Sequence, residues 1–483
     1  MMRLSQLIEG FAKLRGEDVE IGGLSLDSRT VQPGEAFLAL PGTRDDGARF
    51  IPEAVARGCV AVLRDANGAG ADAAGVPLVG IPHLAVNAGE LASRFYGHPS
   101  RSMDVIGVTG TNGKTSFVHL LARALQRRSA SGSIGTLGAG PVGREHALRH
   151  TTPDPISVHR ELAAMRDAGV VSVAMEVSSH ALDQHRVAGV RFAGAAWTNL
   201  TRDHLDYHGS MARYAAAKAR LMAWEGLRFA ILNHDDSWVD EFRKRTGKNV
   251  HCVEYGLKGG DYRAEELQFT GTGVVFTLRS PLGSTRVATR LLGRFNVHNL
   301  LAIAATLGAL GWGLADIAAA IEAAEPVPGR VNALARPGQP VVVIDYAHTP
   351  DALEQCLTAL REHGFRRISC VFGCGGDRDR GKRPLMAAAV EGLADRLIVT
   401  DDNPRTESGD RIIADILAGL QRPDEAIVER DRARAIAQAI RASGAGDLVL
   451  IAGKGHETYQ EVGTERRPFD DRVAALEVLE GAA

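Results

Sequence analysis

Short hydrophobic runs alternate with amphipathic or polar segments through the middle of the chain. The pattern predicts buried strands at residues 103–109 (MDVIGVT), 171–177, 192–198 and 229–232. It also predicts an amphipathic helix at 116–126, directly after a glycine-containing loop. Strands separated in this way by helical or polar sequence are typical of a largely parallel sheet.

Two further patterns follow this region. Residues 262–290 alternate between apolar and polar positions, which predicts antiparallel strands, and helices are predicted at 299–310 and 314–324. After the segment EPVPGR (325–330), strands recur at intervals of about 30 residues, as in a doubly wound, Rossmann-like domain. These last strands are predicted at 341–346, 368–372, 397–400, 426–429 and 448–452.

The loop GTNGKT (110–115), which follows the strand predicted at 103–109, has the composition of a phosphate-binding loop. Its backbone N–H groups and the N-terminus of the following helix can bind phosphate oxygens. Lys114 can bridge the β- and γ-phosphates of a nucleotide, and Thr115 can place its hydroxyl on Mg²⁺. The general pattern has glycine where this chain has Val108, and the alternative is a glycine-rich turn with a solvated lysine. The predicted nucleotide-binding residues here are Gly110, Thr111, Asn112, Gly113, Lys114, Thr115 and Ser116.

Segments that contain proline and glycine mark the predicted domain boundaries. YGHPSR (96–101) and EPVPGR are the two linker candidates. We therefore expect an α/β protein of three domains. They are residues 1–99, residues 100–328 around a P-loop ATPase-like parallel sheet, and residues 329–483 around the Rossmann-like sheet.

The composition argues against several classes of protein. Basic residues number 56 and acidic residues 58, so the net charge of −2 gives no sign of a nucleic-acid or anionic-membrane binder. No apolar run reaches the roughly 18–20 residues that span a bilayer, and residues 1–13 lack the apolar core of a signal peptide. Five scattered cysteines, an odd number, do not suggest a disulfide framework. We expect a monomeric cytoplasmic protein that acts on small molecules.

A series of short motifs runs along the whole chain, from LDSR at residues 26–29 to GKGHE at 453–457. Between these lie GTNGKT (110–115), MEVSSH (175–180), TNLTRDHLDYHG (198–209), YAAAKARL (214–221), GRFNVHNLLAIA (293–304), PGR (328–330) and DYAHTPDAL (345–353). These motifs and their order resemble those of the Mur ligase family.

The resemblance implies an ATP-dependent ligase whose first domain binds a UDP-linked substrate and whose third domain binds an amino acid. Phosphorylation turns a carboxylate into an acyl electrophile that an amine can attack, and Mg²⁺ neutralises phosphate charge. The expected reaction adds meso-2,6-diaminopimelate to the D-glutamate γ-carboxylate of UDP-N-acetylmuramoyl-L-alanyl-D-glutamate, in peptidoglycan precursor synthesis. The alternatives are a lysine-adding or other ligase of the same family, or a P-loop NTPase.

The resemblance also assigns catalytic and metal-binding side chains. Glu176 and His204 are expected to bind Mg²⁺ together with Thr115. From the residues alone, Glu176 also suits a helix cap or a salt bridge, and the pair His204 and His208 suits zinc. Lys218 alone resembles a solvated helix-surface lysine, but its family counterpart is carbamylated (N6-carboxylysine), and a carbamate oxygen suits Mg²⁺. The expected catalytic residues are Lys114, Glu176, His204 and Lys218.

Further nucleotide contacts are implied in the same way. The expected ATP contacts are Asn296 and Asn299 for adenine, Asp345 for ribose and Arg330 for phosphate. Helix N-capping is the alternative for the two asparagines. The expected contacts of the UDP-linked substrate are Leu26, Ser28, Thr151, Thr152, Ser178, Gln184, Arg186 and His208. In the first domain, GTRDDG (42–47) departs from the family's more usual histidine-containing loop.

The incoming amino acid is expected to bind at the motif DNPR. Arg405 offers a planar fork that matches a carboxylate with two hydrogen bonds. DNPR resembles the family version that selects meso-diaminopimelate, which carries a second carboxylate, over lysine. An ordinary turn is the alternative, because Asn-Pro is a turn dipeptide. The expected amino-acid contacts are Arg383, Asp402, Asn403, Pro404, Arg405, Gly453 and Glu457.

Overall fold

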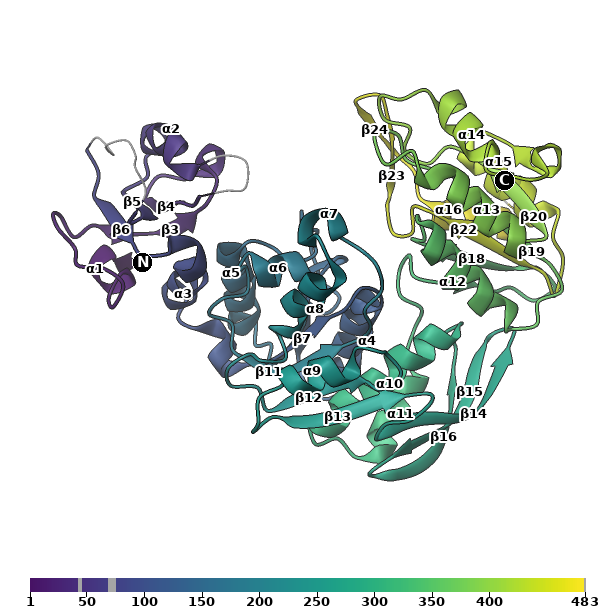
Figure 1. The fold of residues 1–483 in the computed structure, drawn as a ribbon, viewed down its shortest axis with the longest axis horizontal. Coiled ribbons are helices and arrows are strands. Elements are labelled where there is room, and N and C mark those ends of the chain that lie inside the picture. The colour runs from purple at the N-terminus through teal and green to yellow at the C-terminus, as the bar shows by residue number, and fades with distance from the viewer. Residues whose placement is uncertain (42–45, 68–74, 482–483) are drawn as a thin grey trace. The chain divides into compact units, whose positions relative to one another are not determined.

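The computed structural model describes residues 1–41, 46–67 and 75–481 (Figure 1). Their helices and strands confirm the predicted α/β class. The described chain divides into two compact units, Met1–Tyr255 and Gly256–Ala483. Most of the GTRDDG segment, residues 42–45, lies outside the described residues. In the part of the chain that the structure describes, no helix is long and apolar enough to cross a membrane.

A four-stranded parallel sheet, in the order β3-β4-β5-β6, forms the first part of unit 1. Leu38 and Leu63 of this sheet pack with Leu91 of α3 in a buried core. β1 and β2 form a short antiparallel pair beside it. The elements are β1 (Met2–Arg3), α1 (Leu4–Leu7), β2 (Glu20–Ile21), β3 (Gly23–Ser25), β4 (Glu35–Ala39), α2 (Ile51–Ala56), β5 (Ala61–Asp65), β6 (Leu78–Ile81) and α3 (Leu84–Phe95).

The second part of unit 1 is a sheet in which β7 lies between β10 and β11, parallel to both. β8 continues it beyond β10, and β12 and β13 continue it beyond β11. The four strands predicted here are confirmed, with ends shifted by no more than one residue. The elements are β7 (Asp104–Thr109), α4 (Lys114–Gln126), β8 (Ser131–Gly135), β9 (Gly138–Pro141), α5 (Pro155–Asp167), β10 (Ser172–Glu176), α6 (Ser179–Asp183), β11 (Phe192–Trp197), α7 (Leu205–His208), α8 (Met211–Ala219), β12 (Phe229–Asn233), α9 (Val239–Arg245) and β13 (His251–Gly256).

Unit 2 begins with the predicted antiparallel strands, β14 (Tyr262–Thr270), β15 (Gly273–Ser280) and β16 (Gly283–Thr289). Helices α10 (Arg294–Ala309) and α11 (Leu314–Glu322) follow. The predicted start of α10 at residue 299 is wrong, because the helix is capped by Gly293. The polar residues of its first turns hide the apolar periodicity there.

The last sheet has the order β17-β18-β22-β19-β20-β21, and all its pairs are parallel except β17 with β18. Side chains of β18 and β22 alternate between two cores. Val343 and Leu450 pack with α12–α14, whereas Val342 and Ile451 pack with α15 and α16. Both faces are covered, which confirms the doubly wound prediction. The elements are β17 (Asn332–Leu334), β18 (Val341–Asp345), α12 (Pro350–Arg361), β19 (Ile368–Phe372), α13 (Lys382–Leu393), β20 (Arg396–Val399), α14 (Gly409–Leu417), β21 (Ile427–Val428), α15 (Arg432–Arg441), β22 (Leu448–Ala452), β23 (Tyr459–Val462), β24 (Glu465–Pro468) and α16 (Asp471–Leu479).

Candidate active site

The predicted phosphate loop joins β7 to α4, and its backbone requires two glycines. Gly110 has a φ of +153°, and a Cβ there would lie 1.9 Å from Oγ1 of Thr198. Gly113 has a φ of +85° and is the N-cap of α4, a conformation that favours glycine. The N–H groups of the first turn of α4 have no acceptor within the helix and carry the positive end of its dipole. The loop therefore offers donors to a phosphate.

Other groups of this loop already have partners within the protein. The N–H of Thr111 donates to the backbone carbonyl of Asn199, and the N–H of Asn112 donates to the side-chain Oδ1 of Asn199, both at 2.9 Å. Nζ of Lys114 donates to the carbonyls of Gly110 and Thr111 at 2.9 and 2.8 Å. A phosphate oxygen is a stronger acceptor than a carbonyl for this ammonium, because the bond is then charged at both ends.

Glu176 ends β10 beside the phosphate loop and is 1% exposed. Its Oε1 accepts the N–H of Thr136 at 2.8 Å, and its Oε2 accepts the hydroxyl of Thr115 at 3.2 Å. The cap of α6 is Ser178, so Glu176 is not a helix cap. Among the described residues Glu176 forms no ion pair. A buried carboxylate held only by neutral donors favours a cation, which fits the predicted Mg²⁺ site.

Lys218 lies on α8 and is 1% exposed, so the solvated alternative is wrong. Its Nζ donates at 2.6 Å to the carbonyl of Gly110, the same oxygen that Lys114 contacts. It also lies 4.5 Å from the centre of the Tyr214 ring. Burial, and then the charge of Lys114, lowers the pKa of Lys218 well below its ordinary value, against an opposing effect of Asp203.

A cluster of aromatic rings surrounds His180. Its ring centre lies 4.8 Å from that of His204, 4.3 Å from that of Tyr207 and 5.5 Å from that of His208. Nε2 of His208 is hydrogen-bonded to Oγ of Ser179 at 3.0 Å. Burial, and then the charges of His204 and His208, lowers the pKa of His180. His180 was not among the predicted site residues, although it ends the motif MEVSSH.

The sequence spacing of His204 and His208 left zinc as an alternative. Across the described residues, no group of three or more His, Cys, Asp or Glu side chains is placed to hold a metal ion. The predicted Mg²⁺ set consists of Thr115, Glu176, His204 and Lys218. Of these, Lys218 can offer an oxygen ligand only as a carbamate.

Four predicted substrate contacts form one network around the end of β10. The hydroxyl of Thr152 donates to the carbonyl of Glu176 at 2.8 Å and accepts the N–H of Ser178 at 3.1 Å. Arg186 donates to the carbonyl of Thr152 at 3.0 Å and to Oε1 of Gln184 at 2.6 Å. The network holds the Arg186 guanidinium close to the end of β10.

The remaining substrate contacts are less closely associated. The hydroxyl of Thr151 lies 3.0 Å from that of Thr136, which in turn contacts Glu176. Leu26 and Ser28 lie in the first part of unit 1, where Oγ of Ser28 donates to Glu53 at 2.6 Å. No hydrogen bond between described residues joins these two to the Thr152 network, so their uridine contacts stay predictions.

Two predicted adenine contacts lie inside α10. Nδ2 of Asn296 donates to the carbonyl of Leu292 at 2.8 Å, and Nδ2 of Asn299 donates to Oδ1 of Asn296 at 3.2 Å. Both asparagines are buried. Because Gly293 is the N-cap, the capping alternative is wrong.

Arg330 and Asp345 are associated near β18. The carboxylate of Asp345 accepts the N–H of Ala347 at 2.7 Å and that of Val331 at 2.8 Å. Burial raises the pKa of Asp345, and the charge of Arg330 opposes this. The Arg330 guanidinium lies 4.9 Å from the centre of the Tyr346 ring. Each oxygen of Asp345 keeps a lone pair for a ribose hydroxyl.

Arg405 of the DNPR motif is held in place by the protein. Its Nε donates to Oε2 of Glu461 at 2.8 Å, and its Nη1 donates to the carbonyl of Gly376 at 2.9 Å. Oε1 of Glu461 also accepts Nε of Arg466 at 2.9 Å. Glu461, on β23, was missed in the sequence because its role depends on a partner far away in the chain.

Four other predicted amino-acid contacts meet at the carboxyl ends of β20 and β22. Nδ2 of Asn403 donates to Oε2 of Glu457 at 2.9 Å. Gly453 has a φ of +113°, and a Cβ there would lie 2.5 Å from the carboxylate of Asp402. Burial raises the pKa of Asp402. Asp402 and Asn403 are buried, so DNPR is not an exposed turn, and its contacts with an amino acid stay predictions.

Arg383 is fully buried, and its fork is used by the protein. It donates to Glu407 at 2.7 Å and to Asp415 at 2.8 Å, and so ties α13 to α14. The carbonyl of Pro404 closely approaches Gly376, where a Cβ would lie only 1.9 Å away. Substrate contacts of Arg383 and Pro404 stay predictions.

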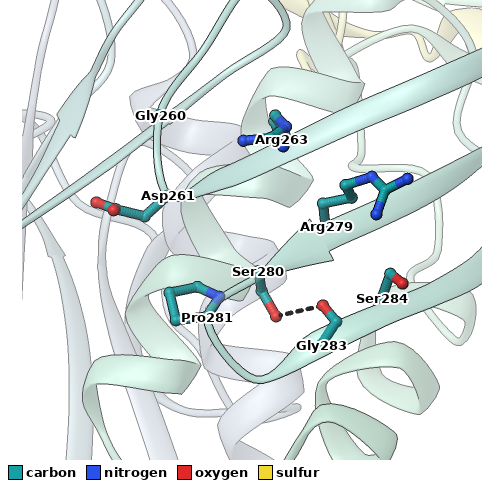
Figure 2. A pocket seen from close by; sticks show the side chains of 8 residues that line it. All are labelled: Gly260, Asp261, Arg263, Arg279, Ser280, Pro281, Gly283 and Ser284. Carbon is teal, nitrogen blue, oxygen red and sulfur yellow. Dashed lines mark hydrogen bonds between the residues drawn. The ribbon is translucent and has the colours of Figure 1, made fainter.

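Two surface hollows in the described chain contain none of the predicted site residues. One of them, of about 420 Å³, lies on the β14–β16 strands. Figure 2 shows its lining residues, among them Arg263 and Arg279, and the hydrogen bond that the Ser280 hydroxyl donates to the Gly283 carbonyl. The other, of about 380 Å³, lies at the amino ends of β7 and β11. The candidate active site is therefore identified from the contacts among its side chains and not from a surface hollow.

Comparison with known proteins assigns the chain to a family. Sequence models match for the catalytic domain of the Mur ligase family at residues 20–96, the Mur ligase middle domain at 108–307 and the Mur ligase glutamate ligase domain at 329–455. The UDP-N-acetylmuramoyl-L-alanyl-D-glutamate–2,6-diaminopimelate ligase of Xanthomonas campestris pv. campestris is 51% identical over 483 residues, covering 99% of this chain and 97% of that protein. The chain belongs to the Mur ligase family. It is therefore a ligase, as predicted.

Other Mur ligases are also similar to this chain. The 2,6-diaminopimelate ligase of Pseudomonas aeruginosa is 49% identical over 468 residues, 96% of each chain. A solved structure of such a ligase has a TM-score of 0.74 at 34% identity and covers 99% of both chains. The MurF ligase of Thermotoga maritima, solved with ADP, shares the fold with a TM-score of 0.63 at 18% identity, covering 97% of this chain and 99% of that one. The predicted three-domain architecture is that of these ligases.

Proposed function

We propose that this Mur ligase adds meso-2,6-diaminopimelate to the D-glutamate γ-carboxylate of UDP-N-acetylmuramoyl-L-alanyl-D-glutamate, with consumption of ATP, in cytoplasmic peptidoglycan precursor synthesis. The observation that carries the choice of amino acid is Arg405. Its guanidinium is oriented by Glu461 and Gly376 beside the buried Asn403. The names and near 50% identity of the relatives support the same reaction.

ATP is proposed to bind with its phosphates at the loop 110–115. The ammonium of Lys114 and the first-turn N–H groups of α4 then stabilise the charge of the transferring phosphoryl group. Mg²⁺ would be held by Thr115, Glu176, His204 and the carbamate of Lys218, and when bound it neutralises phosphate charge. The ATP contacts of Asn296, Asn299, Arg330 and Asp345 stay predictions.

Lys218 is proposed to carry a carbamate in the active enzyme. The neutral amine attacks CO₂, the new N–C bond forms, and one proton is released to solvent. Because burial lowers the pKa of Lys218 well below its ordinary value, the neutral amine that reacts with CO₂ is favoured there. Carbamylation also relieves the repulsion between two ammonium groups on one carbonyl of Gly110.

The ligation itself then takes two transfers. The γ-carboxylate of the substrate attacks the γ-phosphorus of ATP, and ADP leaves. The neutral amine of diaminopimelate attacks the acyl phosphate, inorganic phosphate leaves, and an amide remains. Arg405 binds the distal carboxylate of the amino acid, and Glu457 accepts from its ammonium. Arg186 is proposed to hold the acceptor carboxylate of the nucleotide substrate.

Release of ADP from the purified enzyme tests this function. We expect release to require both the UDP-linked dipeptide and diaminopimelate, with lysine a poor replacement. Release without either substrate would support the P-loop NTPase alternative. Equal use of lysine would support a lysine-adding ligase, and use of neither amino acid would support another ligase of the family.

A further inference from the structure

Lys454, between β22 and β23, is a fully buried lysine to which the proposed reaction gives no role. Its Nζ donates to Oδ1 of Asn403 and to Oε2 of Glu457, both at 3.1 Å. It also lies 5.6 Å from the centre of the Tyr459 ring. A buried ammonium is tolerated only where such partners compensate the lost hydration. Asn403 and Glu457 therefore hold the Lys454 ammonium in place, and the ammonium in turn restrains both of their side chains.

The ammonium and the backbone N–H of Glu461 together determine which way the Asn403 amide faces. Oδ1 of Asn403 accepts from two groups that can only donate, Nζ of Lys454 and the N–H of Glu461, the latter at 2.9 Å. A flipped amide would place its NH₂ group against both donors. Nδ2 therefore faces Glu457, to which it donates one hydrogen at 2.9 Å. Its second N–H is left to donate elsewhere.

The same ammonium restrains the carboxylate of Glu457. Oε2 accepts from both Lys454 and Asn403, which fixes the rotation of the carboxylate. Among the described residues Oε1 of Glu457 has no hydrogen-bond partner, and the side chain is 20% exposed. One free N–H on Asn403 and one free oxygen on Glu457 complement a carboxylate and an ammonium, the two groups that an amino acid carries at its α-carbon.

We propose that Lys454 is a positioning residue of the amino-acid subsite, which fixes the Asn403 amide and the Glu457 carboxylate in the arrangement that receives an amino-acid substrate. This inference rests on the proposed function, because Asn403 and Glu457 are its proposed amino-acid contacts. Lys454 itself does not touch the substrate. Its loss should therefore weaken amino-acid binding selectively and act through Glu457.

The first test compares Lys454→Met and Lys454→Gln with wild type. We expect Lys454→Met to raise KM for diaminopimelate about 10- to 100-fold, the effect of losing a charged hydrogen bond. KM for ATP and for the UDP-linked dipeptide should stay within about twofold. Lys454→Gln, which can still donate to one partner, should be intermediate. A merely structural lysine would lower Tm without this selective change in KM.

A double-mutant cycle separates positioning from stability. If Lys454 acts through Glu457, then Lys454→Met should add less than about threefold to KM in a Glu457→Gln background. Full additivity, or an unchanged KM in a folded single variant, would overturn the proposal. Failure of both single variants to fold would also overturn it, because Lys454 would then be a stability residue.

The wild-type control distinguishes this failure from failure of the proposed function. If the wild type does not use diaminopimelate, the proposed function is wrong. The same KM comparison and double-mutant cycle are then made with whichever amino acid it does use, and they decide the role of Lys454. If the wild type uses diaminopimelate and the variants keep its KM, only the inference about Lys454 is wrong.

Discussion

Lys114 provides the first prediction at the scale of a single residue. Its replacement by alanine removes a cation but keeps Gly110 and Gly113, whose backbone conformations shape the phosphate loop. We expect Lys114→Ala to lower kcat by about 100-fold or more, as loss of one transition-state donor does, with little change in Tm. Turnover and thermal unfolding measured on the same preparation check this. Near-normal turnover with a normal Tm would contradict the assignment of the loop.

Lys218 provides a chemical prediction. We expect a carbamate on its Nζ, detectable by ¹³C NMR after equilibration with ¹³CO₂. Lys218→Ala should be nearly inactive and should regain part of its activity with formate or acetate, whose oxygens replace those of the carbamate. Lys248→Ala, a lysine outside the site, serves as the control. An active wild-type enzyme with no carbamate signal in the presence of CO₂ would rule this chemistry out.

Arg405 carries the prediction on selectivity. Removal of one partner of a desolvated charge pair costs about 2–5 kcal/mol, or roughly 30-fold to several-thousand-fold in affinity. Arg405→Ala should therefore lose most diaminopimelate activity while KM for ATP stays about normal. Arg405→Lys should rescue little, because an ammonium lacks the planar fork.

The matched control for this prediction is Arg466→Ala. Arg466 also pairs with Glu461 but is 66% exposed, and exposed pairs contribute little. Its loss should leave the ratio of kcat/KM for diaminopimelate and lysine unchanged. If wild type uses both amino acids equally, or if Arg405→Ala keeps the wild-type ratio, Arg405 is not the selector.

Residues of the site were predictable where a short motif identifies them, and not where a distant partner does. GTNGKT and DNPR identify Lys114 and Arg405 without the structure. By contrast, Lys454 and Glu461 are charged residues whose roles appear only when β22 and β23 bring them to Asn403 and Arg405. No spacing along the chain reports such contacts.

At the scale of elements, residue composition decides which strands the sequence predicts, because β7 and β8 are both buried. β7 is buried on both faces, so its continuous apolar run was recognised. β8 (SGSIG) and β9 (GAGP) were missed, because glycine and serine carry no strand signal. Their strand conformation comes from tertiary pairing of β8 with β10. Glycine is favoured at position 132, since a Cβ would lie 2.9 Å from the carbonyl oxygen of Gly140 and 2.4 Å from Sδ of Met165.

The ion pair that joins α13 to the loop before α14 predicts a pH dependence of stability. Hydrogen bonds from Arg383 lower the pKa of Glu407 from 4.5 to about 2. The pair therefore contributes its full stabilisation above pH 4.5, and this is lost as pH falls towards 2. Glu407→Gln should be less stable than wild type at pH 7, and the difference in Tm should shrink between pH 4.5 and 2.

The control for this pH dependence is Glu425→Gln. Glu425 forms an exposed ion pair with Arg422, so its replacement should change Tm little at any of these pH values. A difference between wild type and Glu407→Gln that stays constant from pH 7 to pH 2 would show that Glu407 does not titrate against Arg383.

At the scale of the whole molecule, the proposed domain boundaries and the compact units differ in one respect. The three family matches fall inside the proposed domains 1–99, 100–328 and 329–483. The compact units instead divide the chain after Tyr255, within the proposed central domain. Contacts within unit 2 explain this, since His363 accepts the N–H of Gly293 at 2.8 Å and contacts the carbonyl of Thr270 at 2.6 Å. A linker motif in the sequence does not report such packing.

The two units predict separate responses to two substrates. All proposed contacts of the UDP-linked dipeptide lie in Met1–Tyr255, and all those of diaminopimelate lie in Gly256–Ala483. A ligand at 100 times its Kd stabilises the part that binds it by about 2.7 kcal/mol. For a part of this size, that raises Tm by roughly 5–10 °C. Each substrate should therefore shift the unfolding of one unit more than that of the other.

Tryptophan fluorescence can follow unit 1 alone. Of the four tryptophans, Trp197, Trp224 and Trp238 lie in unit 1 and Trp312 lies in unit 2. In Trp312→Phe the emission reports only on unit 1, and we expect the UDP-linked dipeptide, but not diaminopimelate, to raise its midpoint. Calorimetry of the same variant, which detects both units, should show a shift with each ligand. The contrary result is that diaminopimelate raises the fluorescence midpoint as much as the dipeptide does. That result would mean that the two units unfold together, or that diaminopimelate does not bind at the DNPR and GKGHE motifs.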